Sequence, residues 1–526
     1  MPALLSDIVD ASADRHPDRP AFRCGGSELT YAALADRTDR LAATLIGNGV
    51  RPGDRVGIRL RKSVETAVAV YGVMKAGAAF VPLDPALPPA RLASILRDAG
   101  VRHLVTHDPL RQTLSTALDA GAEVDVVIGL SRPLEGVPTT ASWDEVTRVP
   151  SGPRPDRTPD DMAYFMYTSG STGPPKGIVH THRSGMAYAR HAASVYGLRP
   201  EDRLSGFAPL HFDMSTFDYF SGPLAGAATV VIPEGYMLMP ASLSALIEAE
   251  RLTVWYSVPH ALVSLLLRGV LDERDLTSIR WVLYGGEPFP VGHLRALMER
   301  WPHARFSNVY GPAEVNQCTY HHLPGPPASG ETIPIGHVWE IAEGLVLDGD
   351  AVLPDGAVGE LAIHAPTMMR GYWNRPDLDA LAFYRRSSGG ETHTFYRTGD
   401  LVRRDPDGTH WFIGRRDRQI KTRGYRVELD EVEAALLTHP GVAEAAVYAV
   451  PEADGSHAIH AAVVLRADSD ATVEDLLTTA GDQVPRYALP VQTTLALDLP
   501  RTTSGKADRR ALQQQALAAA AQPPLQ

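Results

Sequence analysis

Cysteine is almost missing from this sequence of 526 residues, which contains only Cys24 and Cys318. Two thiols so far apart in the chain provide neither a disulfide framework nor a cysteine-based metal site, so a reducing cytoplasm is the expected compartment. The opening stretch "MPALLSDIVDASADRHPDRP" also lacks the basic start and the long apolar centre of a signal peptide. We therefore expect no export.

Positive charge and long apolar runs are also scarce. The formal net charge is −12, which argues against nucleic acid as the main partner. No apolar run reaches the length that spans a bilayer, so no membrane partner is expected. The hydrophobic content of 44% is nevertheless that of an ordinary globular protein, and the chain is too long for one core. Two or more domains are expected.

Apolar segments of two kinds alternate through the first part of the chain. Short β-branched stretches predict strands at 55–60, 228–233, 252–258 and 279–287, and longer periodic stretches predict helices at 63–77, 241–252 and 291–302. This alternation indicates an α/β fold with layered, mostly parallel sheets. From about residue 345, alternating polarity and the turns "PDG" and "DG" predict antiparallel hairpins, and a small αβ unit follows.

The segment "YTSGSTGPPKG" (167–177) has the composition of a phosphate-binding loop. It is not a Walker A loop, because Gly177 follows the lysine where that motif needs Ser or Thr. Glycines let backbone N–H groups approach an anion closely, and five side chains add donors: Thr168, Ser169, Ser171, Thr172 and Lys176. The flanking residues predict a strand on each side and then a helix. A flexible surface turn is the alternative that composition alone leaves open.

Four more segments carry groups capable of chemistry: "NVYGPAE" (308–314), "YRTGDL" (396–401), "GRRDRQIKTRGYR" (414–426) and "PRTTSGKADRR" (500–510). Each has an ordinary structural explanation when it is taken alone. Glu314 and Asp400 would then be solvated turn carboxylates, Tyr310 a core aromatic and Lys506 a surface lysine. Their order along one chain is the informative feature.

In this order the five segments resemble the adenylate-forming (ANL) superfamily, which includes acyl-CoA ligases, adenylation domains of nonribosomal peptide synthetases and luciferases. The resemblance covers nearly the whole chain, about residues 1–515. It implies a large N-terminal domain of layered sheets plus a β-rich subdomain, and a small mobile α+β C-terminal domain. The implied boundaries are 1–413 for the adenylation core, 414–417 for a hinge at Asp417, and 418–526 for the C-terminal domain.

The resemblance implies ATP and Mg²⁺ as cofactors. Joining a carboxylate to ATP brings two anions together, so cations must offset the repulsion. Glu314 looks like the Mg²⁺ ligand, a hard oxygen donor suited to that ion. The phosphate loop looks like the element that holds the β- and γ-phosphates, through Thr168, Ser169, Gly170, Thr172 and Lys176.

Other nucleotide contacts follow from the same resemblance. Tyr310 looks like the ring stacked on adenine, with Asn308 at its edge, and Asp400 like the ribose ligand, assisted by Arg415. Lys506 looks like the mobile lysine that bridges the carboxylate and the α-phosphate. The implied catalytic set is Lys506, Thr168, Lys176 and Glu314.

Two further positions bear on the resemblance. Gly424 is similar to the position that lines the thiol tunnel, where bulk would block a pantetheine arm. Ala313 departs from the family pattern, which usually has Thr or Ser before the glutamate. This departure puts a hydroxyl contact to the α-phosphate in doubt, but not the reaction.

The stretch "PLHFDMSTFDYF" (209–220) bears on the acid that is activated. A zwitterion needs a buried anion for its ammonium, and Asp213 stands where amino-acid-activating members of the family keep an aspartate. A helix cap made by Asp213 or Ser215 is the structural alternative. Aligned on the family pattern, the rest of the pocket is formed by Met214, Phe217, Ser257, Leu283, Gly285, Val309, Gln317 and Cys318.

This pocket is short and has no second charge, so a small neutral amino acid is the main expectation: alanine, glycine or serine. L-Proline and β-amino acids are the alternatives. Freestanding prolyl-carrier-protein ligases share the local pattern of "FDMSTFDYF" and the run of Asn316, Cys318 and Tyr320. An acyl- or aryl-CoA ligase would share every nucleotide motif, and Asp213 argues against it.

The expected acceptor is a separate carrier protein, because the chain ends soon after Lys506. The thiol of its phosphopantetheine arm would attack the aminoacyl-AMP, as in natural-product biosynthesis by nonribosomal peptide synthetases. Carrier proteins are acidic, so docking near the basic run is a hypothesis with an electrostatic reason. The cations of this run are Arg415, Arg416, Arg418, Lys421, Arg423 and Arg426.

Overall fold

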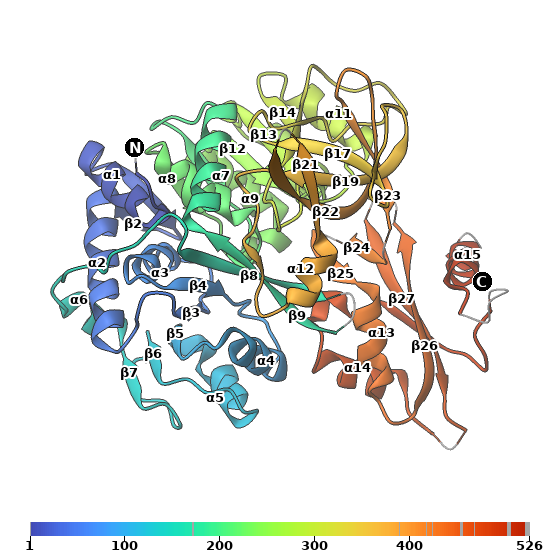
Figure 1. The fold of residues 1–526 in the computed structure, drawn as a ribbon, viewed down its shortest axis with the longest axis horizontal. Helices are drawn as coiled ribbons and strands as arrows, with labels where there is room; N and C mark the ends of the chain where they lie inside the picture. Colours follow the sequence, from blue (N-terminus) through green and yellow to red (C-terminus); the bar gives the residue numbers. More distant parts are fainter. Residues whose placement is uncertain are drawn as a thin grey trace.

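The computed structural model describes residues 2–170, 173–388, 390–416, 418–422, 424–452, 456–467, 469–501 and 507–520. Two large sheets, a smaller antiparallel sheet and a separate C-terminal domain follow one another along the chain (Figure 1). The predicted fold class is therefore confirmed. Among the described residues, none of the helices combines the length and apolar character needed to cross a bilayer.

The first large sheet carries the phosphate loop. Its strand order is β20-β9-β8-β4-β3-β5-β6-β7. The strands from β8 to β7 run parallel, whereas the pairs β8–β9 and β9–β20 are antiparallel. The strands are β3 (Arg55–Ile58), β4 (Ala79–Pro82), β5 (His103–Val105), β6 (Val126–Ile128), β7 (Thr139–Ala141), β8 (Met162–Gly170), β9 (Gly173–Thr181) and β20 (Gly371–Tyr372). The strands predicted on both sides of the loop therefore form one hairpin, β8–β9, which leads into helix α7 (His182–Val195).

The second large sheet has the order β16-β15-β14-β13-β12-β10-β11-β1-β2. It is parallel from β14 to β1, and the neighbours at each end are antiparallel. Its strands are β1 (Pro20–Cys24), β2 (Ser27–Thr30), β10 (Arg203–Gly206), β11 (Ala228–Val231), β12 (Val254–Ser257), β13 (Trp281–Gly285), β14 (Arg305–Tyr310), β15 (Thr319–Leu323) and β16 (His337–Val338). The carboxyl ends of parallel strands are where α/β sheets bind ligands.

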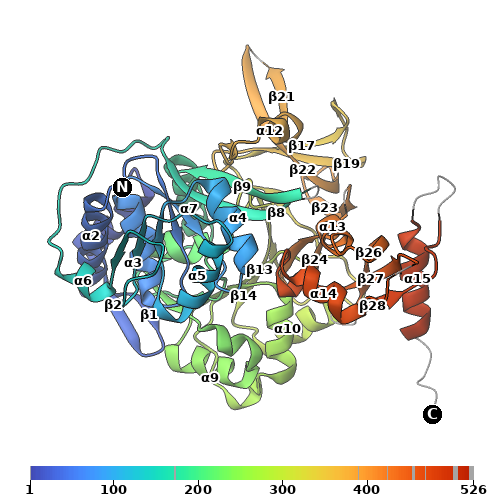
Figure 2. The same cartoon turned by 90° about the horizontal axis from the view of Figure 1, so that it is seen from below.

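Helices cover both sheets and pack between them (Figures 1 and 2). They are α1 (Ile8–Arg15), α2 (Tyr31–Gly47), α3 (Val64–Lys75), α4 (Pro89–Ala99), α5 (Arg111–Asp119), α6 (Trp143–Arg148), α8 (Gly222–Leu224), α9 (Pro240–Glu250), α10 (Pro259–Arg268) and α11 (Val291–Arg300). Every residue of α3 except Glu65 is buried, because its sequence is apolar on all sides. A Cβ at Gly72 would lie 2.7 Å from a methyl group of Leu41, so this glycine lets α2 and α3 pack closely.

An antiparallel sheet follows, as the turn signals after residue 345 predict. It contains β17 (Glu343–Asp348), β18 (Ala351–Val352), β19 (Val358–His364), β21 (Phe383–Ser388), β22 (Glu391–Arg404) and β23 (His410–Arg415), with α12 (Pro376–Ala382) beside it. The C-terminal domain holds β24 (Gln419–Thr422), β25 (Tyr425–Glu428), α13 (Leu429–Leu437), β26 (Val442–Pro451), β27 (His457–Leu465), α14 (Val473–Gly481), β28 (Gln492–Leu495) and α15 (Arg509–Ala520).

The predicted domain boundary falls between two β elements, since β23 ends at Arg415 and β24 begins at Gln419. The predicted hinge residue, Asp417, lies outside the described residues, as does Lys506. The C-terminal domain turns the hairpin β24–β25 towards the N-terminal domain and places α15 at its outer edge (Figures 1 and 2). A salt bridge of 2.7 Å between Arg91 and Glu431 also joins the two domains.

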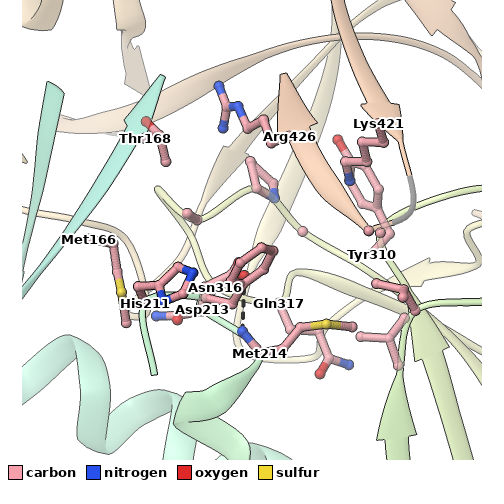
Figure 3. Close-up of a pocket in the computed structure, with 18 of the residues that line it drawn as sticks. Met166, Thr168, His211, Asp213, Met214, Tyr310, Asn316, Gln317, Lys421 and Arg426 are labelled. Atoms are coloured by element: carbon pink, nitrogen blue, oxygen red, sulfur yellow. Dashed lines mark hydrogen bonds between the residues drawn. The ribbon is translucent and has the colours of Figure 1, made fainter. Parts of the chain in front are cut away.

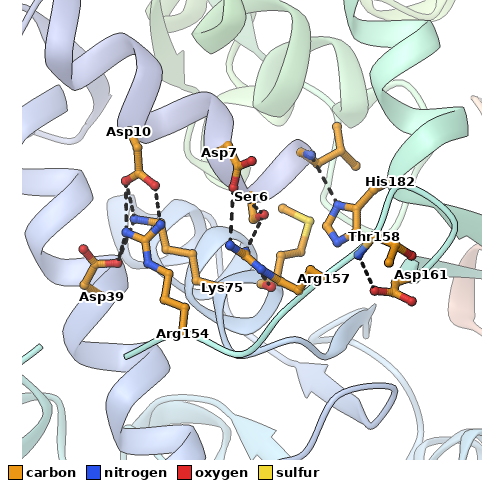
Figure 4. A network of polar contacts seen from close by, with 12 residues as sticks. Ser6, Asp7, Asp10, Asp39, Lys75, Arg154, Arg157, Thr158, Asp161 and His182 are labelled. Atoms are coloured by element: carbon orange, nitrogen blue, oxygen red, sulfur yellow. Dashed lines mark hydrogen bonds and ion pairs between the residues drawn. The ribbon is translucent and has the colours of Figure 1, made fainter. Parts of the chain in front are cut away.

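A partly buried ionic network fastens the first three helices to the extended segment before β8 (Figure 4). Lys75 has no exposed side-chain surface, and its ammonium lies 2.7 Å from Asp10 and 3.0 Å from Asp39. Arg154 binds the same two carboxylates. Two cations and two carboxylates thus neutralise one another among α1, α2, α3 and residue 154.

We predict that Lys75→Met lowers the free energy of unfolding by about 3 kcal/mol, because Asp10 and Asp39 would keep only Arg154 as a partner. Calorimetric melting of the purified protein should show a transition several degrees lower. Arg183→Met is the matched control, because its 2.7 Å pair with Asp160 is exposed and should contribute less than about 1 kcal/mol. Equal melting temperatures for the two variants would contradict this account.

Candidate active site

A cavity of about 160 Å³ lies where the N-terminal domain meets the hairpin β24–β25. The N-terminal domain contributes the ends of β8, β12 and β14, the loop after β10 and the turn after β14. The C-terminal domain contributes Lys421, Gly424 and Arg426 from the hairpin region, and also Tyr487. In Figure 3, Asp213 and Met214 occupy one side of the cavity, and Lys421 and Arg426 the other. Both domains therefore complete the site.

Asp400 joins two predicted nucleotide contacts into one cluster. It faces Arg415 across the β22–β23 pair, and an Arg415 nitrogen lies 2.5 Å from its carboxylate. The hydroxyl of Tyr310, at the end of β14, donates to the other carboxylate oxygen. Asn308 lies two residues earlier on β14 and donates from its side-chain amide to the carbonyl of Pro334 at 2.8 Å. The structure therefore brings Tyr310, Asp400 and Arg415 together at the cavity wall.

Glu314 is a fully buried carboxylate at the junction of three regions. Tyr372 of β20 donates to it at 2.8 Å, and Lys176 of β9 lies 3.5 Å away. Arg426 of the C-terminal hairpin lies 3.4 Å from its other oxygen. Burial by itself would raise the pKa of Glu314, but the positive charges of Arg426 and Lys176 outweigh this effect and lower it. Glu314 is thus held as an anion.

The described residues of the phosphate loop belong to the two strands of the β8–β9 hairpin, in which Thr168 pairs with Lys176. Burial lowers the pKa of the Lys176 ammonium, and the charge of Glu314 acts in the opposite direction. The hydroxyl oxygen of Thr168 is buried and has no partner among the described residues, although Thr168 lines the cavity. The backbone of Ser169 and Gly170 ends β8, and Thr172 lies outside the described residues.

Asp213 stands in the loop after β10 and lines the cavity. Its side chain accepts a hydrogen bond from the backbone N–H of Met214 at 2.9 Å. The helical segment that begins at Phe217 has no side-chain cap, and the Ser215 hydroxyl donates to the carbonyl of Leu210 instead. Burial raises the pKa of the Asp213 carboxyl, while the charge of Lys421 acts in the opposite direction. No side-chain cap bond from Asp213 or Ser215 therefore reaches the segment Phe217–Ser221, and the role of Asp213 towards an ammonium stays a prediction.

The predicted pocket residues fall into two groups. Met214, Val309 and Gln317 line the cavity with Asp213. The other predicted members are buried and are not among the residues that line this cavity, so their part in the substrate pocket stays a prediction: Phe217, Ser257, Leu283, Gly285 and Cys318.

Their positions in the sheet explain the difference. Phe217 and Leu283 belong to the apolar cluster beneath the cavity, where Phe217 packs edge-on against Tyr256. Ser257 points to the opposite face of β12, where it accepts a hydrogen bond from Trp255, because neighbouring strand residues alternate in direction. At Gly285, a Cβ would lie 2.2 Å from the carbonyl oxygen of Val309.

Gly424 fills a position in the cavity wall that excludes a side chain. Its φ is +85°, and a Cβ there would lie 2.8 Å from Val258. Its backbone N–H donates to Glu287 at 3.2 Å. The glycine therefore permits a close contact between the two domains at the cavity.

Most cations of the basic run around this glycine are paired within the molecule, and docking near the run stays a prediction. Arg415, Arg416, Arg418 and Arg426 form salt bridges, and Lys421 lines the cavity. Arg423 lies outside the described residues. Charges that are already paired contribute little long-range attraction for a docking partner.

Several site residues were not predicted from the sequence. Tyr188 and Tyr256 line the cavity, and nothing in their sequence context distinguishes them from core tyrosines. Tyr372 lies in the stretch "RGYW", in which a glycine followed by an aromatic residue was the one feature that could have indicated a site residue. Asn316 was not assigned to the pocket either, although it precedes the predicted Gln317 and is as deeply buried.

The described residues contain no group of three or more His, Cys, Asp or Glu side chains that could hold a metal ion. Glu314 is the one carboxylate at the predicted metal position, and it is ionised. Mg²⁺ is commonly held by one or two carboxylates together with phosphate oxygens and water. The donor set therefore fits Mg²⁺ only in company with a bound phosphate.

Family comparison agrees with this geometry. Residues 9–373 match the AMP-binding enzyme family, and residues 431–506 match the AMP-binding enzyme C-terminal domain. An L-proline–[L-prolyl-carrier protein] ligase of Pseudomonas fluorescens is 35% identical over 97% of this chain and 99% of its own length. An enzyme of the same name from Streptomyces coelicolor is 36% identical over 97% of this chain and 96% of its own length.

Solved structures show the same architecture. An amide bond synthetase from Marinactinospora thermotolerans superposes with a TM-score of 0.86 at 27% identity, covering 97% of this chain and 99% of that one. A nonribosomal peptide synthetase protein with adenylation and carrier domains superposes with a TM-score of 0.82 at 26% identity, covering 97% and 84%. The chain belongs to the AMP-binding enzymes and is an adenylate-forming enzyme of the ANL superfamily.

Proposed function

We propose that the enzyme activates L-proline with ATP as prolyl-AMP and transfers the prolyl group to the phosphopantetheine thiol of a separate carrier protein. The observation that carries this proposal is the full-length similarity to two prolyl-carrier-protein ligases. This similarity favours L-proline, an alternative substrate predicted from the sequence, over alanine, glycine or serine.

The cavity is compatible with a cyclic amino acid. Asp213 supplies an anion for the ammonium, and Tyr188, Met214, Tyr256 and Val309 provide an apolar wall for a ring. The cluster beneath the cavity, which contains Phe217 and Leu283, is buried and apolar, and the cavity above it has a volume of about 160 Å³. Apolar contact with the ring and one buried ion pair would together select proline.

In the first half-reaction, an oxygen of the proline carboxylate attacks the α-phosphorus of ATP and pyrophosphate leaves. We infer that Asp400 and Arg415 hold the ribose, Tyr310 and Asn308 the adenine, and Lys176 with Thr168 the leaving phosphates. Ser169, Gly170 and Thr172 complete that loop. Mg²⁺ bound through Glu314 would neutralise charge on the phosphates. Lys506 would bridge the two reacting anions.

In the second half-reaction, the pantetheine thiolate attacks the acyl carbon, and AMP departs with the electrons of the broken C–O bond. We infer that Gly424 lines the path of the thiol, because its close contact with Val258 leaves no space for a side chain. A rotation about Asp417 would exchange Lys506 for the hairpin β24–β25 between the two steps. The hairpin faces the cavity in this structure.

We predict that L-proline gives the fastest ATP–pyrophosphate exchange in a panel with alanine, glycine, serine, β-amino, fatty and aryl acids. A maximum at alanine, glycine or serine would refute the substrate and keep the class of enzyme. Loading is then measured with holo-carrier protein, coenzyme A or a simple amine as the acceptor. We expect the carrier thioester, and activity confined to acids without an amine would instead indicate an acyl-CoA ligase.

We predict that Asp213→Asn lowers kcat/KM for L-proline by about 100-fold, because a buried ammonium would lose its counterion. Binding needs the ionised carboxylate, and burial raises its pKa, so wild-type kcat/KM should fall as the pH drops through that raised value. The variant should lose this acidic limb, while its KM for ATP stays unchanged. An acidic limb that persists in the variant would return Asp213 to a structural role.

We predict that Lys506→Ala lowers the rate of adenylation by about 100-fold or more, because the charge developing between the carboxylate and the α-phosphate would lose its cation. ATP should still bind, which equilibrium dialysis with the labelled nucleotide can measure. Weak ATP binding combined with normal turnover would refute the assigned role.

A further inference from the structure

Two consecutive side-chain amides, Asn316 and Gln317, form part of the cavity wall. Each is only 3% exposed. Neighbouring residues of a strand would point to opposite faces, but Asn316 has a left-handed backbone with a φ of +57°. Asparagine tolerates this conformation better than most residues. The turn therefore presents two amides to one cavity.

Tyrosines hold the N–H groups of both amides. The Asn316 amide donates to the hydroxyl of Tyr164 at 3.2 Å, and the Gln317 amide donates to the hydroxyl of Tyr196 at 2.9 Å. The two carbonyl oxygens, Oδ1 and Oε1, are buried and have no hydrogen-bond partner within the described part of the chain. A buried carbonyl without a donor is unfavourable, so such groups usually have a partner.

Asn316 and Asp213 both line the cavity. Tyr164, the partner of Asn316, lies within the electrostatic influence of Asp213: burial raises the pKa of Tyr164, and the Asp213 charge adds to this. Gln317 is bound to Tyr196, which packs edge-on against Phe217 and Trp281 at the base of the cavity. The oxygen of Asn316 and the carboxylate of Asp213 are therefore two acceptors in the wall of one cavity.

The support behind Asn316 is rigid. Tyr164 stacks on His180 with ring centroids 4.7 Å apart, and His180 binds the carbonyl of Ala313 at 2.9 Å. Burial lowers the pKa of His180 to about 4, so the ring is neutral at neutral pH. A Cβ at Gly311 would lie 1.9 Å from the backbone carbonyl oxygen of Asn316, so only glycine allows the two segments of the turn to approach so closely. The amide orientation is therefore built into the fold.

We propose that Asn316 is a substrate-specificity residue whose side-chain oxygen accepts an N–H of the substrate ammonium while Asp213 pairs with its charge. This inference rests on the proposed activation of an amino acid. A secondary ammonium such as that of proline has two N–H donors, one for each acceptor. An acid without an amine would leave both Asn316 Oδ1 and Asp213 buried and unpaired, and would be rejected for that reason.

The test compares two substrates in two enzymes. N-Methyl-L-proline keeps the positive charge but has one N–H fewer than L-proline. The measured quantity is the ratio of kcat/KM for L-proline to kcat/KM for N-methyl-L-proline. This ratio should be about tenfold or more lower in Asn316→Gly than in the wild-type enzyme. Glycine tolerates the left-handed backbone, so this variant removes the acceptor without backbone strain. Asn316→Asp, which restores an oxygen at the same place, should recover most of the ratio.

Asn374→Gly is the matched control, because Asn374 is also left-handed, with a φ of +52°, but is exposed and away from the cavity. It should leave the ratio unchanged. KM for ATP should stay the same in every variant. A ratio that is equal in the wild type and Asn316→Gly would overturn the proposal.

The two proposals can fail separately. If another amino acid gives the fastest exchange, the comparison uses that amino acid and its N-methyl derivative. The proline assignment then fails, while Asn316 is still tested. If no acid with an amine is activated, the proposed function and the role of Asn316 both fail. If an amino acid is activated but Asn316→Gly leaves the ratio unchanged, only the role of Asn316 is refuted.

Discussion

The charge on Glu314 is the constraint around which the site is arranged. A carboxylate with no exposed surface must be paired, and its partners come from three regions that are distant in the sequence: Lys176, Tyr372 and Arg426. One lies in the phosphate hairpin, one in the short strand β20 and one in the C-terminal domain. Pairing this anion therefore fixes how these regions meet.

The same pairing links the position of the C-terminal domain to the charge state of the site. Arg426 reaches Glu314 only because the hairpin β24–β25 faces the cavity. An arginine and a divalent cation compete for the same carboxylate oxygens. Withdrawal of the hairpin would leave Glu314 short of positive charge, a deficit that a metal–phosphate complex can fill. In the proposed function, these electrostatics would favour a bound nucleotide with the hairpin withdrawn and a docked hairpin after the phosphates have left.

The fold could be predicted well because it depends on local patterns. Alternating apolar stretches marked α3, α9 and α11 to within a few residues, and the flanks of the phosphate loop marked β8 and β9. The clustering of Tyr310, Asp400 and Arg415 followed from motif resemblance, and the structure places them together. Motifs fix a small number of side chains whose geometry the chemistry requires.

The walls of the pocket could not be predicted equally well. Phe217 and Leu283 lie in the buried layer beneath the cavity and not in its wall. Side chains alternate in direction along β12, so Ser257 points away from the cavity and binds Trp255. Such details depend on how strands stack, which no local pattern specifies. The ion pairs of the basic run could not be predicted for a similar reason, because its partners, such as Glu360 for Arg416, come from elsewhere in the chain.

The contact between β13 and β14 limits how such a pocket can be redesigned. At Gly285, any side chain would collide with the backbone carbonyl of Val309 rather than with a movable side chain. A larger residue there would have to push two central strands of a parallel sheet apart, disturbing hydrogen bonds well beyond the pocket. Laboratory evolution towards new acids should therefore leave this glycine untouched and gain its variation from Met214 and Gln317, whose side chains line the cavity.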